Sequence, residues 1–294
     1  MHIFPFSHEH TLTAQEFLHC CRDCERSYQL ISERLQDFHA QISRYSSKEL
    51  RLLSQQEIYQ LYLVLDDIAH LECGHNLAER ILASRNIQVM LPDIRWYYNT
   101  FFEVHETCLV QEVLTADDPW QPLQVFGLYP RYKALIRTQM EQLDLPHPER
   151  LAFVGCGPLP LSLILLNRLY GIKSVGLDID PKAVALAEQC LARLGLEEEI
   201  AVVQGAEDAL ATLDWDAVVV AALAEPKQQI FATLRRIMAI SGKRPVICRT
   251  YSGLKTLLHP SVQEEDYRGF AVHHEIRPEH NRVNNTLLQL ELIG

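Results

Sequence analysis

The sequence contains no run of 18 or more apolar residues, and its first residues, MHIFPFSHEHTL, lack the basic and apolar regions of a secretory signal. It also lacks an excess of positive charge: 27 Lys and Arg face 38 Asp and Glu, a formal net charge of -11 at pH 7. Proteins that bind a phosphate backbone or an anionic membrane need a basic stripe. We therefore expect a cytoplasmic protein with no nucleic-acid partner and no membrane partner.

The eight cysteines form neither a disulfide framework nor a complete metal site. Disulfide frameworks are typical of short secreted chains, whereas these cysteines are spaced irregularly through 294 residues. One CxxC occurs, because Cys21 and Cys24 follow His19 and Cys20. No second CxxC or HxxxH completes a zinc site, so we expect no metal cofactor and rank direct metal binding last among the possible functions.

The amino-terminal half has helical periodicity between about residues 13 and 84. Further helices are expected within 97–114 and 129–143, separated by the turn-rich TADDPWQPLQ and closed by the prolines of DLPHPER. We predict that residues 1–147 form a helical domain. Apolar residues at three- and four-residue steps carry this prediction: Leu53, Ile58, Leu61, Val64, Ile68, Leu71 and Leu77.

After Glu149 short apolar runs alternate with helical patterns. The expected strands are LAFVG, SVGLDID, IAVVQG, DAVVVAALA, PVICRT and TLLQLEL, with helices over 159–170, 181–194 and 226–240. Such alternation indicates βαβ units and a parallel sheet covered by helices on both faces. The predicted fold class is α/β, with a Rossmann-like, doubly wound sheet over residues 148–294 after the helical domain. Ligands of such sheets bind at the carboxyl ends of the strands.

The stretch LAFVGCGPLPLSLILL places glycines where the first strand ends and the next helix begins. Gly155 and Gly157 let a ligand approach the backbone, although a tight turn alone also explains them. Asp178, 21 residues after Gly157, and Asp180 end the second strand. A carboxylate in this place can bond the ribose hydroxyls of an adenosine. Asp180 before Pro181 is also a good helix N-cap.

The turn after the third strand, QGAEDAL, adds Ala206 and Glu207 beside the expected adenine. A favourable helix N-terminus explains Glu207 equally well. The GxGxxG of dinucleotide enzymes is incomplete, because Pro160 stands in the third glycine position. A missing glycine and no basic cradle favour a ligand without phosphates, and S-adenosylmethionine fits that description. Enzymes that use it often carry an acid before the glycines, where this chain has Phe153 and Val154.

The segment FVGCGPLPLS resembles the GxGPLPL turn of the nicotianamine synthase family and of its bacterial relatives that make opine-type metallophores. The resemblance continues in LDIDPKAV, DAVVVAALAEPKQQIFATLRRIM, RTYSGLKTLLHPSV and GFAVHHEIRPEHNRVNNTLL, which together cover nearly all of residues 151–290 in order. Upstream, FGLYPRYKAL resembles the tyrosine-bearing segment of the family. The resemblance places Pro158, Leu159 and Ala222 in the cofactor site beside the residues above.

The resemblance implies transfer of the 3-amino-3-carboxypropyl group of S-adenosylmethionine to an amine, with 5′-methylthioadenosine as the by-product. S-adenosylmethionine would be a co-substrate, and the enzyme would choose which sulfonium carbon it presents to the nucleophile. A carboxylate must accept the proton of the acceptor amine. In the family this role belongs to a glutamate of the helical domain. Glu79 is our first candidate and Glu72, seven residues away, the second; either can also be a solvated helix residue.

The resemblance also implies that Tyr129 and Tyr132 orient the acceptor amine or the aminobutyrate carboxylate, unless they are only packed tyrosines. Arg249 after the fifth strand, and Asn284 more weakly, are candidates to bind a carboxylate of substrate or cofactor. Histidine is the expected acceptor, with its stereochemistry open, and a separate opine dehydrogenase would then use the product. A homodimer would match the commonest oligomeric state.

Two alternatives stay open at this point. An ordinary S-adenosylmethionine-dependent methyltransferase shares the glycine turn, the ribose acid and the sheet pattern, and would release S-adenosylhomocysteine. A non-catalytic module would bind a partner through its helical half and retain only a nucleotide pocket. The first alternative is distinguished by its by-product, and the second by cofactor binding without turnover.

Overall fold

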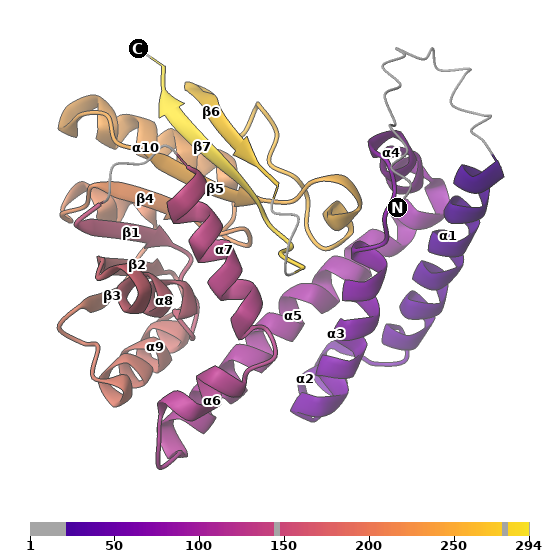
Figure 1. The fold of residues 1–294 in the computed structure, drawn as a ribbon, viewed down its shortest axis with the longest axis horizontal. Coiled ribbons are helices and arrows are strands. Elements are labelled where there is room, and N and C mark those ends of the chain that lie inside the picture. Colours follow the sequence, from indigo (N-terminus) through magenta and orange to yellow (C-terminus); the bar gives the residue numbers. More distant parts are fainter. Residues whose placement is uncertain (1–21, 144–147, 278–281, 294) are drawn as a thin grey trace, which may run out of the picture.

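The structure is a computed structural model that describes residues 22–143, 148–277 and 282–293. The predicted group of His19, Cys20 and Cys21 lies outside the described residues. Figure 1 shows the helices of residues 22–83 on one side and a twisted sheet with its own helices on the other, with the helix over 85–115 between them and the helix over 129–142 on the side of the sheet.

The amino-terminal half is helical, as its periodicity predicts. Two of its helices begin at capping boxes, in which Ser46 pairs with Glu49 and Ser54 with Glu57. No helix of the described residues is both long and apolar enough to cross a bilayer. The helices are α1 (Arg22–Ile42), α2 (Ser47–Arg51), α3 (Gln55–Ala69), α4 (His75–Ala83), α5 (Arg85–Thr115), α6 (Trp120–Val125) and α7 (Tyr129–Gln142).

Two helical boundaries differ from the sequence prediction. Helix α5 begins at Arg85, well before residue 97, and continues through Pro92, because the buried Ile87, Leu91 and Ile94 keep the helical spacing across the exposed proline. The segment predicted as a turn contains α6, which starts where the Asp118 carboxylate accepts a hydrogen bond from a backbone N–H. In α5 the packing of buried residues, and in α6 the capping at Asp118, therefore outweigh the tendency of proline and turn residues to end a helix.

The sheet has seven strands in the order β3-β2-β1-β4-β5-β7-β6. The first five in sequence are parallel, whereas β7 runs antiparallel to β5 and to β6, so the prediction of a wholly parallel sheet is wrong for this edge. The sequence analysis missed β6, since most of its residues are exposed and it lacks the apolar signal of a buried strand. The strands are β1 (Arg150–Val154), β2 (Lys173–Asp178), β3 (Ile200–Gln204), β4 (Ala217–Val220), β5 (Val246–Thr250), β6 (Phe270–Ile276) and β7 (Thr286–Leu292).

Helices cover both faces of the sheet, which confirms the doubly wound α/β fold class. Helices α8 (Leu161–Tyr170) and α9 (Pro181–Leu194) pack on one face, and α10 (Lys227–Ser241) packs on the other. In β1 the alternation of side chains sends Leu151 and Phe153 to the first face and Ala152 and Val154 to the second.

The core on the α8 face continues without interruption into the helical half. Strand order reverses between β1 and β4, and their loops diverge at the point where ligands bind in such sheets. Helices α5 and α7 lie over this point. The division of the chain at residue 147 stays a prediction.

Candidate active site

A cavity of about 520 Å³ lies between α5, α7 and the carboxyl ends of the strands. Its size is in the range of pockets that hold small molecules. Most residues selected from the sequence line it: Gly155, Gly157, Pro158, Leu159, Asp178, Asp180, Ala206, Glu207, Ala222, Tyr132, Arg249 and Asn284. Tyr129, Glu79 and Glu72 do not.

The turn after β1 needs its two glycines for two reasons. Both have positive φ, +81° at Gly155 and +68° at Gly157, which favours glycine. A Cβ at Gly155 would come within 2.8 Å of the Ala224 Cβ, and one at Gly157 within 3.0 Å of Oε2 of Glu106. The turn is thus closed in by the loop after β4 on one side and by helix α5 on the other.

The carboxylates at the ends of β2 and β3 have local partners. Asp178 accepts hydrogen bonds from the N–H of Gly157 at 2.9 Å and of Asp180 at 3.0 Å, so it ties the glycine turn to its own strand. Asp180 caps α9 by accepting from the Lys182 N–H. The buried Glu207 accepts from two side chains of α10, those of Gln229 and Thr233.

A buried ammonium holds the loop after β4. Lys227, 3% exposed, donates to the carbonyls of Ala222, at 3.0 Å, and Ala224, and to the Glu225 carboxylate at 3.3 Å. A buried cation is costly, and the amino end of a helix, where Lys227 stands, repels positive charge further. The carbonyls must therefore be held in place, which fixes the loop that forms one wall of the cavity.

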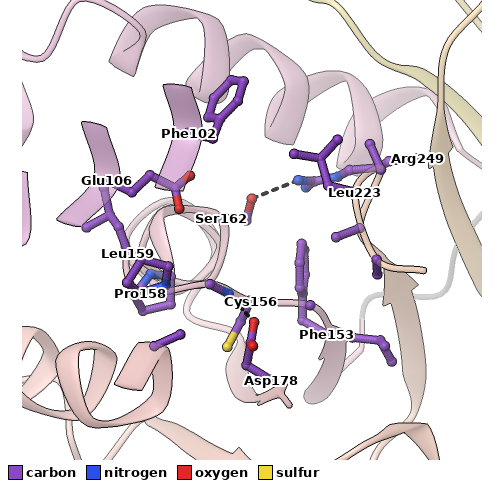
Figure 2. A pocket seen from close by; sticks show the side chains of 18 of the residues that line it. Phe102, Glu106, Phe153, Cys156, Pro158, Leu159, Ser162, Asp178, Leu223 and Arg249 are labelled. Carbon is purple, nitrogen blue, oxygen red and sulfur yellow. Dashed lines mark hydrogen bonds between the residues drawn. The ribbon is translucent and has the colours of Figure 1, made fainter. Parts of the chain in front are cut away.

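Glu106 on α5 is the acid that the helical half brings to the cavity. Figure 2 shows its carboxylate directed into the pocket, above the turn that carries Cys156 and Pro158. The carboxylate keeps part of its surface accessible because it faces the cavity. Burial of this deep site raises the pKa of Glu106 to about 8; the nearby Asp178 charge acts in the same direction, and the hydrogen bond from Tyr132 opposes it.

The two candidate tyrosines separate in space. Tyr132 lines the cavity and donates to Oε1 of Glu106 at 3.4 Å. Burial and the Glu106 charge raise the pKa of the Tyr132 hydroxyl well above its usual value, so it stays a donor. Tyr129, three residues earlier on α7, does not line the cavity and packs against the apolar core instead.

The structure does not bring Glu79 and Glu72 to the cavity. Glu79 is exposed, forms an ion pair with His75 at 3.1 Å and lines a second, smaller cavity. Glu72 lies in the segment between α3, which ends at Ala69, and α4. The seven-residue spacing therefore does not place both acids on one helical face, because the helix is interrupted between them.

Arg249 at the end of β5 is a buried guanidinium without an acidic partner among the described residues. It is 4% exposed and donates to the neutral Ser162 and Gln139 side chains, at 2.8 and 3.1 Å, while its Nε has no partner. Burial lowers the pKa of Arg249 to about 10, so the group remains charged at neutral pH. Such a site is prepared for a carboxylate supplied by a ligand.

A polar cluster from α3, α5, α7 and the segment before β7 lines part of the cavity. Arg131 binds both carboxylate oxygens of the buried Asp66, at 2.6 and 3.0 Å, and donates to the Tyr62 hydroxyl. Asn284, selected from the sequence, donates to the Tyr62 and Tyr98 hydroxyls at 3.4 and 3.3 Å. Asn284 is therefore placed by side chains of α3 and α5, beside groups that can bind the polar end of a small molecule.

The sequence analysis missed Glu106, although a signal for it existed. Within YYNTFFEVHETC, Glu106 follows Phe102 by four residues and Tyr98 by eight, the spacing of one helical face. An acid on a stripe that is otherwise apolar or aromatic is unusual and marks a candidate site. In the described part of the chain, no group of three or more His, Cys, Asp and Glu is arranged to hold a metal ion.

Comparisons with known proteins agree with this arrangement. Residues 24–291 match the model of the family described as nicotianamine synthase protein. An L-histidine 2-aminobutanoyltransferase of Pseudomonas aeruginosa is 30% identical over 139 residues, 47% of this chain and 52% of that protein. Nicotianamine synthase 2 of Arabidopsis thaliana is 29% identical over 190 residues, 60% of this chain and 59% of that protein. The chain thus spans about half to three fifths of these relatives.

A similar solved structure matches over more of the chain. It is the crystal structure of a glutamate-to-glutamine mutant of MtNAS in complex with S-adenosylmethionine, with a TM-score of 0.79 and 28% identity, covering 94% of this chain and 100% of that chain. MtNAS in complex with MTA and tNA gives the same values. The likeness extends over both the helical half and the sheet.

Proposed function

Because the chain belongs to the nicotianamine synthase family, we propose that it is a transferase that moves the 3-amino-3-carboxypropyl group of S-adenosylmethionine to the amine of an amino acid. The by-product is 5′-methylthioadenosine. The observation that carries the proposal is the position of Glu106, a half-buried carboxyl that faces the glycine turn from the opposite wall of the cavity.

The chain's own residues fit S-adenosylmethionine. The turn at Gly155 and Gly157 leaves space that a Cβ would fill, and the Asp178 carboxylate beside it is placed to bond ribose hydroxyls. The orphaned Nε of Arg249 fits the carboxylate of the aminobutyrate portion, and the loop held by Lys227 offers alanine side chains to the adenosine. No basic group is needed, because the ligand has no phosphate.

The sulfonium activates each of its three carbons, so the protein must position the acceptor and remove its proton. We assign the proton acceptor to Glu106 in place of Glu79 and Glu72, which lie outside the cavity. Tyr132 orients the Glu106 carboxyl through its hydrogen bond. We assign Tyr129 no part in the reaction. The acceptor nitrogen attacks the carbon, the carbon–sulfur bond breaks, and its electron pair stays on sulfur.

Histidine is the acceptor that we propose first. Support comes from the relative named L-histidine 2-aminobutanoyltransferase, although the plant relatives are named nicotianamine synthases. The cavity end with Tyr62, Tyr98, Arg131 and Asn284 offers aromatic faces and hydrogen-bond donors to such an acceptor. A metallophore pathway with a later opine dehydrogenase step, a homodimer and a cytoplasmic location complete the proposal and rest on the sequence analysis.

Product analysis tests the proposal. The purified protein is incubated with S-adenosylmethionine and, in separate reactions, L-histidine, D-histidine, glutamate or no acceptor, and the products are identified by mass spectrometry. We expect 5′-methylthioadenosine together with a histidine that carries one aminobutyrate unit. S-adenosylhomocysteine as the by-product would make the protein a methyltransferase, and cofactor binding without turnover in any reaction would favour a binding module.

A further inference from the structure

The electrostatic balance of the cavity leaves Glu106 without a counter-ion. Among the described residues no Lys, Arg or His forms an ion pair with it, and its hydrogen-bond partner is the neutral Tyr132. An ionised carboxylate that is partly removed from water and has no counter-ion is disfavoured, and its pKa rises so that the neutral form persists to higher pH. The empty cavity therefore favours the protonated form of Glu106.

The groups that face Glu106 from the surrounding elements do not change this conclusion. Tyr132 from α7 and Cys156 from the glycine turn stay neutral, since burial raises the pKa of each. Asp178 from β2 carries a negative charge that disfavours ionisation of Glu106. Arg249 from β5 is charged; it donates hydrogen bonds to Ser162 and Gln139, forms no ion pair with Glu106, and opposes the rise in the pKa of Tyr132.

The place where a cation would relieve this imbalance is defined by geometry. Oε2 of Glu106 lies 3.0 Å from the position of a Cβ at Gly157, so only the space of a missing side chain separates the carboxylate from the turn. On the other side of that turn, Asp178 holds the Gly157 N–H. A ligand bound beside the turn would therefore lie close to both acidic side chains, in a place suited to a permanent positive charge.

We propose that Glu106 is also the counter-ion of the sulfonium: it is protonated in the ligand-free cavity and loses its proton to solvent when S-adenosylmethionine binds. The inference rests on the proposed function and adds an order of events to it. The base that accepts the acceptor's proton does not exist until the co-substrate is present, so binding of S-adenosylmethionine precedes productive binding of the acceptor.

Protons and charges balance over the cycle. Binding of the sulfonium releases one proton from Glu106. The acceptor ammonium then gives one proton to the Glu106 carboxylate, its nitrogen forms a bond to carbon, and the carbon–sulfur bond breaks with its electron pair on sulfur. The positive charge passes from sulfur to the new secondary ammonium. Glu106 is left protonated beside a neutral thioether, which is the state it had in the empty cavity.

Proton counting in a calorimeter tests the inference without an acceptor. The heat of binding is measured in two buffers of different ionisation enthalpy, once for S-adenosylmethionine and once for S-adenosylhomocysteine, which carries the same amino acid group but no sulfonium. At pH 6 to 7 we expect the sulfonium ligand to release about one proton more than the thioether. We also expect the ratio of the two affinities to rise about tenfold per pH unit up to about pH 8.

Two variants make the assignment specific. Glu106→Gln should remove both the extra proton and the pH dependence of the affinity ratio, whereas Glu112→Gln, an exposed acid on the same helix, should retain both. Equal proton release by the two ligands in the unmodified protein would overturn the inference, and this comparison needs no variant. The calorimetry contains no acceptor, so its result is independent of the product analysis. If the extra proton is released on binding but the product analysis finds no transfer, the proposed reaction is refuted and the counter-ion role of Glu106 stands.

Discussion

The two walls of the cavity hold their functional groups in different ways. On the sheet side, backbone turns and short-range hydrogen bonds position the functional groups. The glycine turn, Asp178 and the loop held by Lys227 are each fixed by partners within a few residues or on the next strand. On the helical side, Glu106 and Tyr132 project from separate helices and meet only in the folded protein. In the proposed reaction, cofactor binding thus depends on a local motif, and acid–base chemistry depends on how two helices pack.

The largest effect should come from the helical wall. Replacing Glu106 by Gln removes the proposed proton acceptor and keeps the shape of the side chain, so turnover should fall by roughly two to four orders of magnitude. The matched variant Glu79→Gln changes an exposed acid outside the main cavity, and should leave turnover within about twofold of the unmodified protein. Initial rates of 5′-methylthioadenosine release measure both. A large loss of turnover in Glu79→Gln together with little change in Glu106→Gln would instead make Glu79 the proton acceptor.

A second variant separates backbone strain from the space that the ligand needs. Gly157→Ala places a Cβ against Glu106, whereas Gly171→Ala has the same φ of +68° and nothing within 4 Å. Both should lose roughly 1 to 2 kcal/mol of stability through the positive φ. Only Gly157→Ala should also weaken S-adenosylmethionine binding, by about 10- to 100-fold. Equal dissociation constants for the two variants, from equilibrium dialysis, would argue against close approach of the ligand at Gly157.

Glu106 should also reduce the stability of the ligand-free protein at alkaline pH. Its pKa rises from 4.5 to about 8 on folding, so stability is lost as pH increases through this window, in which the unfolded chain ionises and the folded one does not. Glu106→Gln should therefore exceed the unmodified protein in unfolding free energy by roughly 2 kcal/mol at pH 8, allowing for partial screening by water. Near pH 4 this advantage should vanish. Urea denaturation at both pH values measures this difference in unfolding free energy and its sign. A difference that does not depend on pH would mean that ionisation of Glu106 is not its cause.

The smallest predicted effect concerns the sheet wall. Asp178→Asn keeps the size of the side chain but weakens its acceptors, and should raise the dissociation constant of S-adenosylmethionine by about tenfold. Asp180→Asn is the matched control, because its side chain caps α9 and an asparagine is also a good cap. That variant should bind nearly as tightly as the unmodified protein. A larger loss from Asp180→Asn would move the ribose site to Asp180.

The sequence predicts the sheet wall better than the helical wall for a physical reason. The glycine turn, Asp178 and Arg249 stand at the ends of strands, and the ends of parallel strands meet at one edge whatever the details of packing. The position of Glu106 depends on the rotation of a 31-residue helix and on its contact with α7. Glu79 and Glu72 are also glutamates at a helical spacing, but the chain leaves the helix between α3 and α4, and neither side chain lines the cavity.

The same reasoning explains the two strands at the sheet edge. Alternation of apolar residues finds buried strands, and β1 to β5 carry that pattern. β6 is an edge strand whose side chains include His273, His274 and Glu275 facing water, and an irregularity between Val272 and His274 interrupts its pairing, so it lacks the buried apolar run that identifies the other strands. The direction of β7 is likewise not encoded locally, because a strand pattern is the same in parallel and antiparallel pairing.

A crystal structure of the protein with S-adenosylmethionine bound would test the central claim most directly. The account predicts the sulfonium sulfur over the glycine turn, with a Glu106 oxygen within about 6 Å of it and the aminobutyrate carboxylate on Arg249. A sulfonium more than about 10 Å from Glu106, beyond the range of an effective charge pair in salt solution, would contradict the account. In that case the cofactor site on the sheet side and Glu106 on the helical side would not take part in the same reaction.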